Sequence, residues 1–108
     1  IDVLATMPGR RILVMGDMGE VGEAAAQFHD EVGGHAKSSG IERLFALGAL
    51  SADAAHNFGE GARHFDDVAM LVAALLPELD ATTTVLVKGS RFMKMERVAD
   101  ALAAEETL

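Results

Sequence analysis

The fold is decided by the stretch Ile12-Leu13-Val14-Met15-Gly16-Asp17-Met18-Gly19-Glu20-Val21-Gly22, in which an apolar run ends at a glycine and a polar turn follows. Residues 11–15 have the pattern of a buried parallel strand, and residues 24–39 have the period of a helix. The same succession of apolar run, polar turn and helical stripe recurs along the chain. Alternating strands and helices favour a parallel sheet.

The remaining elements repeat this alternation. Later strands are expected at residues 43–47, 62–65 and 83–87, and later helices at residues 51–57, over the stripe 68–75 and at residues 91–103. The predicted fold class is α/β, with an open, mainly parallel sheet, helices on both faces and the order β-α-β-α-β-α-β-α. The chain is expected to form a single domain over residues 1–108.

Polar residues and glycines mark where the predicted helices begin and end. Ser51 is the expected cap of the second helix, and Asp66 or Asp67 that of the third. Gly40 is placed to end the first helix in a left-handed conformation, and Gly59 is placed to close the second.

The predicted strand order places a ligand site at one position. Since crossovers between parallel strands are right-handed, the simplest arrangement puts the first strand in the middle. The second and third strands then lie on one side of it, and the fourth on the other. The strand order reverses between strands one and four, which lead into Gly16 and Lys88. Open α/β sheets bind their ligands at such a point, so a site is expected there.

Composition excludes several classes of protein. The chain has 108 residues, a net charge of −8 and no cysteine. Acidity at this level argues against binding to nucleic acid or to an anionic membrane surface. Without cysteine there is no disulfide, thiolate catalysis or cysteine-based zinc site. No apolar run approaches the roughly 20 residues of a transmembrane helix, and no signal peptide is recognisable, so a cytoplasmic location is expected.

The first loop is acidic and carries three glycines. Gly16, Gly19 and Gly22 are spaced G-x-x-G-x-x-G, which differs from the dinucleotide fingerprint G-x-G-x-x-G. Asp17 and Glu20 would also repel a pyrophosphate, so a nicotinamide or flavin site is disfavoured. Carboxylates here suit a hydroxyl, an ammonium group or a hydrated cation. An alternative is a tight turn whose acids stabilise the next helix through its dipole, and the spacing leaves both interpretations open.

The second loop, Lys88-Gly89-Ser90-Arg91, is basic. It lacks the P-loop pattern, in which four residues separate a glycine from Gly-Lys-Ser/Thr. Ser90 can cap the following helix, and the amides after Gly89 can hold a carboxylate or a phosphate. Two cations at a strand end in so acidic a chain favour anion recognition over a plain helix cap.

The histidines do not indicate a metal site. His29 and His35 are six residues apart on the first helix and do not share a face, which predicts helix-flank or partly buried side chains. His56 and His64 have no second ligand at metal-binding spacing. No metal ligand is therefore predicted.

Taken together, the motifs resemble the C-terminal domain of the Mur ligases, ATP-dependent enzymes that add amino acids to the peptidoglycan precursor. The run from Ile12 to Gly22 carries the first signature. The other matching segments follow in the expected order: His29-Asp30-Glu31-Val32-Gly33, Gly40-Ile41, the turn at Gly48, His64-Phe65, and Val87-Lys88-Gly89-Ser90-Arg91 with Met95-Glu96. The resemblance implies a Rossmann-like fold.

The resemblance also implies a cytoplasmic enzyme of three domains. A first domain would bind UDP-MurNAc-tripeptide, and a central ATPase domain would hold ATP and Mg²⁺. The C-terminal domain would close over the site and help to bind the incoming D-alanyl-D-alanine and the nucleotide. Residues 1–6 are interpreted as the tail of a preceding helix, and the family's Asn-Ala-Asn-Pro segment is not in the sequence. The fragment is therefore expected to bind no cofactor and to be inactive alone.

The resemblance assigns binding roles, but no catalytic role, to this chain. A zwitterionic dipeptide needs an anion site for its carboxylate and polar or acidic groups near its amine. The expected contacts on the acceptor or phosphate side are Lys88, Gly89, Ser90 and Arg91. The expected opposite wall is Asp17, Met18, Gly19 and Glu20, with Ser51 in the turn after Gly48 as a weaker candidate.

Two other functions fit parts of the pattern. A stand-alone flavodoxin-like or receiver-like module would use Asp17 as its phosphoacceptor. It would also need an acidic pair after an earlier strand, and only a helix tail precedes residues 11–15. A fragment that binds NAD is disfavoured by the glycine spacing.

Overall fold

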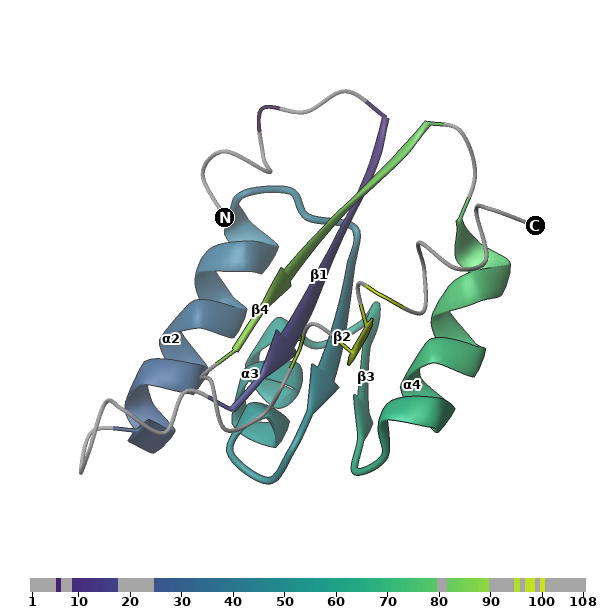
Figure 1. Ribbon diagram of the computed structural model, residues 1–108. Helices are drawn as coiled ribbons and strands as arrows, with labels where there is room; N and C mark the ends of the chain where they lie inside the picture. Colours follow the sequence, from purple (N-terminus) through teal and green to yellow (C-terminus); the bar gives the residue numbers. More distant parts are fainter. Residues whose placement is uncertain are drawn as a thin grey trace.

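The computed structural model describes residue 6, residues 9–17, 25–79 and 82–89, and residues 95, 97, 98 and 100. The strands are β1 (Arg10–Gly16), β2 (Arg43–Leu47), β3 (Ala62–Phe65) and β4 (Thr83–Lys88). The helices are α2 (Ala25–Ser38), α3 (Ser51–Phe58) and α4 (Val68–Leu75), which continues into the 3-10 turn η2 (Leu76–Glu78) (Figure 1). Residues 1–5 and most of 91–103, where helices are expected, lie outside the described residues.

The described strands form one parallel sheet in the order β3-β2-β1-β4. This confirms the predicted order, with β1 in the middle and the reversal between β1 and β4. Ile12 of β1 pairs with Arg43 of β2 on one side and with Val85 of β4 on the other. The carboxyl ends of all four strands therefore lie at one edge of the sheet.

Alternating side chains of the strands supply two separate cores. Ile12 and Val14 of β1 face α4, where they pack with Leu71 and Leu75. Leu13 and its alternate neighbours face the other way, toward α2 and α3. Because β1 buries side chains on both faces, its sequence is a continuous apolar run. Helices thus cover both faces of the sheet, as predicted (Figure 1).

Local sequence signals account for several helix ends. Gly40, with φ of 83°, lies in the left-handed region expected of a helix stop. Gly59 closes α3 with φ of 80° and ψ of −134°, a different backbone conformation that also favours glycine. Asp67 caps α4, since its carboxylate accepts the backbone N–H of Met70 at 3.1 Å. Asp67, and not Asp66, is therefore the cap of this helix.

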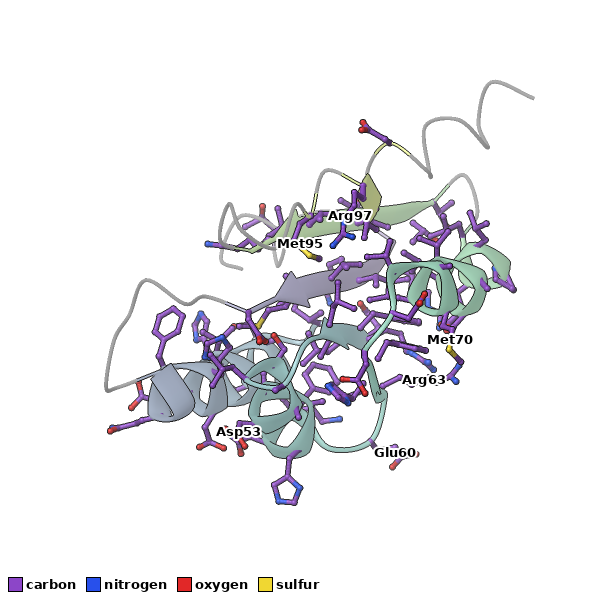
Figure 2. The ribbon with its side chains drawn as sticks, turned by 60° about the horizontal axis from the view of Figure 1, so that its bottom comes forward. Asp53, Glu60, Arg63, Met70, Met95 and Arg97 are labelled. Atoms are coloured by element: carbon purple, nitrogen blue, oxygen red, sulfur yellow. The ribbon has the colours of Figure 1, made fainter. Side chains whose placement is uncertain are left out.

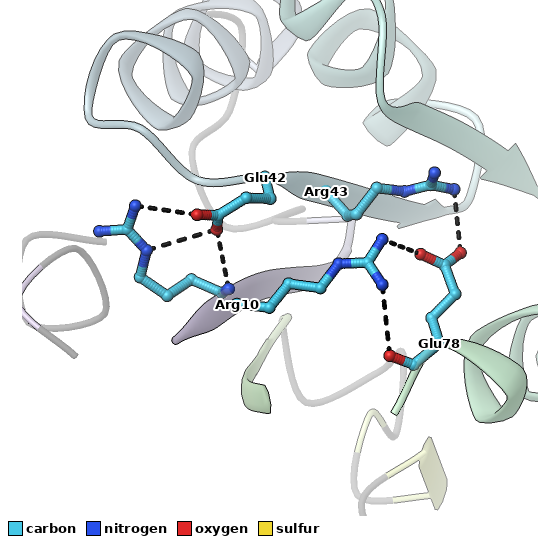
Figure 3. Close-up of polar contacts among 5 residues, drawn as sticks. Arg10, Glu42, Arg43 and Glu78 are labelled. Carbon is cyan, nitrogen blue, oxygen red and sulfur yellow. Dashed lines mark hydrogen bonds and ion pairs between the residues drawn. The ribbon is translucent and has the colours of Figure 1, made fainter. Parts of the chain in front are cut away.

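The amino ends of the strands carry internal ion pairs (Figure 3). Glu78 of η2 bridges Arg10 at 2.7 Å and Arg43 at 3.0 Å. Glu42 pairs with the Arg11 guanidinium at 3.1 Å and accepts the Arg11 backbone N–H at 2.8 Å. Partial burial alone would raise the pKa of Glu42, but these hydrogen bonds from Arg11 outweigh it and hold the pKa below its ordinary value. The cations at this end of the sheet are engaged within the fold.

Candidate functional site

The opposite edge of the sheet brings the two predicted loops together. Met15 of β1 is the register partner of Lys88 of β4, so Asp17 and Gly89 follow at the same edge. The structure therefore agrees with the predicted proximity for the part of each loop that it describes. The remaining predicted site residues, namely Met18, Gly19, Glu20, Ser90 and Arg91, lie outside the described residues.

Asp17 binds the amino end of a neighbouring helix. Its Oδ1 accepts the backbone N–H of Ser51 at 2.7 Å, and its Oδ2 accepts that of Leu50 at 3.2 Å. These amides begin α3, where the first N–H groups have no partner within the helix. The carboxylate is also favoured there by the helix dipole. Asp17 is only 9% exposed, so a large part of its hydrogen-bonding capacity is used inside the fold.

This contact corrects two expectations about helix caps. Ser51 does not cap α3: the residue at the cap position is Leu50, and no side chain of the helix's own start bonds to its amides. The Ser51 side chain is fully buried, and its hydroxyl has no hydrogen-bond partner within the described part of the chain. The acid of the first loop does stabilise a helix, as the alternative interpretation proposed. That helix is α3, which follows β2, and not the next helix in sequence.

Gly48 makes room for the Asp17 carboxyl group. A Cβ on Gly48 would lie 2.6 Å from the Asp17 Cγ, and φ at Gly48 is +105°, which disfavours any other residue. The Gly48 carbonyl accepts a hydrogen bond from Nε2 of His64, 2.7 Å away, at the end of β3. In the sequence, His64 is weighed as a metal ligand and as part of the matching segment His64-Phe65, and neither predicts this contact. Its actual contact ties the loops after β2 and β3 together.

The ends of β1 and β4 meet closely, and Met95 covers them on one face. A Cβ on Gly16 would lie 2.5 Å from the Met95 sulfur, and one on Gly89 would collide with the same side chain. Figure 2 shows Met95 beside these two strands, and Met95 is 5% exposed. A dinucleotide site would need open backbone at this point, so the packing of Met95 disfavours the NAD alternative.

Lys88 supplies an exposed positive charge at this edge. It is exposed at the end of β4, and strand alternation with Leu86 places its side chain on the face covered by α2 and α3. The buried Asp17 contacts α3 on the same face. The site therefore combines an exposed cation with a carboxylate whose charge is offset by backbone amides, which suits an anionic group of a ligand.

Neither the histidines nor the helices that the structure describes indicate a metal site or a membrane span. His29 is fully buried on α2, with its ring edge-on to Phe28 at 5.7 Å, whereas His35 is exposed. Among the described residues, no three histidine or acidic side chains gather where a metal ion would fit. Within the same residues, no helix has the length and apolar character needed to cross a membrane.

Comparison with known proteins shows the family and the fold of the chain. A family model described as Mur ligase, glutamate ligase domain, matches residues 1–91. UDP-N-acetylmuramoyl-tripeptide–D-alanyl-D-alanine ligase of Escherichia coli (strain K12) is 41% identical over 109 residues, covering 99% of this chain and 24% of the relative. The enzyme of the same name from Buchnera aphidicola subsp. Acyrthosiphon pisum (strain APS) is 40% identical over 107 residues, covering 97% and 23%.

Solved structures share the fold. The crystal structure of MurF from Acinetobacter baumannii superposes with a TM-score of 0.83 at 27% identity, covering 93% of this chain and 23% of that one. MurF ligase from Thermotoga maritima, in complex with ADP, gives a TM-score of 0.79 at 24% identity over 92% of this chain and 23% of that one, which shows the fold alone. The chain spans about a quarter of the length of the curated relatives it matches.

Proposed function

This chain belongs to the Mur ligase family, and we propose that it is the C-terminal domain of a ligase that joins D-alanyl-D-alanine to UDP-MurNAc-tripeptide. Support comes from relatives of that name, which are 40% and 41% identical over nearly the whole chain. The Rossmann-like fold expected from the resemblance also agrees with the A. baumannii structure.

The reaction sets the task of such a domain. In this family the tripeptide carboxylate is activated by ATP as an acyl phosphate, and the amine of the dipeptide then attacks the acyl carbon and releases phosphate. ATP and Mg²⁺ would be held mainly by a central domain of the same polypeptide, which would be the principal partner of this one. An ADP complex of a relative agrees with the use of ATP. Substrates that carry UDP and a need for ATP favour the cytoplasm as the location.

The contribution proposed for this chain is to hold the acceptor dipeptide at the carboxyl edge of the sheet. The single observation that carries the proposal is the placement of exposed Lys88 and the anchored Asp17 on one face, where the strand order reverses. Proposed contacts for the dipeptide carboxylate or a phosphate are Lys88, Gly89, Ser90 and Arg91. The proposed opposite wall is Met18, Gly19 and Glu20, while Ser51 is too buried for a direct contact.

The experiment is steady-state kinetics of the full-length ligase with D-alanyl-D-alanine as the varied substrate. Lys88→Gln removes the exposed charge and is expected to raise the KM for the dipeptide about tenfold. Lys37→Gln is the matched control, because Lys37 lies on α2 and donates to the carbonyl of Glu60. The dipeptide KM of this control should not change.

Two outcomes would contradict the proposal. One is a full-length enzyme that releases no ADP when ATP, UDP-MurNAc-tripeptide and D-alanyl-D-alanine are all supplied. The other is an equal effect of the two lysine substitutions on the dipeptide KM. The same ADP-release assay with the 108-residue chain alone is expected to show no turnover.

A further inference from the structure

We propose that Asp17 is a positioning residue for the acceptor site, which acts by fixing the turn at residues 48–51 and does not itself contact the substrate. The inference rests on the proposed function, and it revises the expectation that Asp17 lines the wall of the site. It is carried by the contacts of one buried carboxylate with a loop that follows a different strand.

The Asp17 carboxylate joins two loops that are far apart in sequence. It accepts the amides of Leu50 and Ser51, which are 33 and 34 residues away. Hydrogen bonds to a carboxylate are stronger than those between neutral groups. Since α3 has no cap from its own start, Asp17 is the group that holds the start of this helix against the end of β1. The position of the turn therefore depends on Asp17.

Gly48 shows that the turn is built around this carboxylate. No side chain fits at Gly48 while Asp17 is in place, and the hydroxyl of Ser51 lies buried beside the contact without a partner among the described residues. Leaving a buried hydroxyl without a partner is unfavourable. The turn thus has room for the Asp17 carboxylate only because residue 48 has no side chain, which indicates that the position of Asp17 is important.

The contact also offsets the negative charge of Asp17 near Lys88. Asp17 and Lys88 lie on the same face of neighbouring strands, so an untethered carboxylate at position 17 would compete with a substrate carboxylate for Lys88. Two backbone amides and the amino end of α3 offset the charge of Asp17 instead. Asp17 therefore does not compete with an anionic ligand for Lys88.

The test uses two substitutions that break the same contact from opposite sides. Asp17→Asn removes the charge, and Gly48→Ala keeps the charge but displaces the carboxylate. In the full-length ligase, each is expected to raise the KM for D-alanyl-D-alanine about tenfold and to leave the KM for ATP unchanged. The double variant should resemble either single one, because residues that act through one contact are not additive.

Asp17→Glu extends the test to a variant that retains the charge. Its side chain is one methylene longer, which displaces the carboxylate from the two amides, so we expect it to behave like Asp17→Asn. Asp53→Asn is the matched control, because Asp53 is an exposed acid in the first turn of the same helix (Figure 2). Its dipeptide KM should equal that of the unmodified enzyme. Should Gly48→Ala fail to fold, Asp17→Asn and Asp17→Glu still test the inference, because both are expected to raise the dipeptide KM.

The outcomes separate this inference from the proposed function. An unmodified enzyme that does not ligate the dipeptide counts against the proposed function. An active enzyme overturns the inference alone if Asp17→Asn leaves the dipeptide KM unchanged or if Asp17→Glu retains the normal value. It is also overturned if the effects of Asp17→Asn and Gly48→Ala multiply to about a hundredfold, as independent sites would.

Discussion

Gly33 of α2 packs directly against the backbone of Ala54 in α3. A Cβ on Gly33 would lie 2.8 Å from the Ala54 carbonyl carbon and would collide with its oxygen. Gly33→Ala is therefore expected to lower the free energy of unfolding by about 2 kcal/mol, although alanine favours an isolated helix. Urea denaturation of the 108-residue chain measures this change.

Gly34→Ala is the matched control for this close packing. Its Cβ would meet the Asn57 side-chain amide at 2.7 Å, and a side chain can move where backbone cannot. The free energy of unfolding should change by less than about 0.5 kcal/mol, since the gain in helix propensity offsets the shift of Asn57. If Gly33→Ala lowers the free energy of unfolding no more than Gly34→Ala does, the close backbone packing of Gly33 does not contribute as proposed.

The cap of α4 gives a second prediction. Because the Asp67 carboxylate accepts the amide of Met70, Asp67→Ala should lower the free energy of unfolding by about 1 kcal/mol. Asp66→Ala removes the same charge from the preceding, exposed residue, and should change it by less than about 0.5 kcal/mol. Thermal denaturation of the two variants in parallel distinguishes them. The prediction is wrong if both melt at the same temperature.

Much of the fold follows from local patterns in the sequence. The strands predicted at 43–47 and 62–65 coincide with β2 and β3, and the one predicted at 11–15 is extended by one residue at each end in β1. Apolar runs that end at glycine predict β1 and β2 well because most residues of these two strands are buried, whereas β3 is half exposed. The strand order was also predictable, since right-handed crossovers leave few arrangements of four parallel strands.

The candidate site was less predictable because its contacts join distant segments. Serine is a residue type that often caps helices, but the amide of Ser51 is bound by Asp17, 34 residues earlier. Local propensity carries no information about such a partner. The adjacent glycines Gly33 and Gly34 inside a helix were a usable signal, because a glycine there often marks a close approach of backbone.

The pKa of Glu42 predicts how stability depends on pH. Because the pKa is lowered in the folded protein, the contribution of Glu42 is present above the ordinary glutamate pKa of about 4.3 and is lost as the pH falls through the folded value. Glu42 is 39% exposed, so the contribution should stay below about 1 kcal/mol. Urea denaturation at a series of pH values from neutral to acidic should show a smaller loss of stability for Glu42→Gln.

Glu60→Gln controls for the change of net charge in that experiment. Glu60 is exposed, and the described part of the chain shows no ion pair of its carboxylate (Figure 2). Its substitution should leave the pH dependence of the free energy of unfolding as in the unmodified chain. A curve for Glu42→Gln that runs parallel to that of the unmodified chain would contradict the role assigned to Arg11.

Glu78 carries the last prediction, because it is the shared partner of Arg10 and Arg43. The Arg43 side chain is 25% exposed and its Nε has no partner among the described residues, so Glu78→Ala leaves a partly buried charge without its carboxylate. The expected loss in the free energy of unfolding is about 2 kcal/mol. Arg43→Met in the same background should restore at least half of it. If the double variant is instead less stable, the stacking of Arg43 on Phe45, 5.3 Å from the ring centre, outweighs its ion pair.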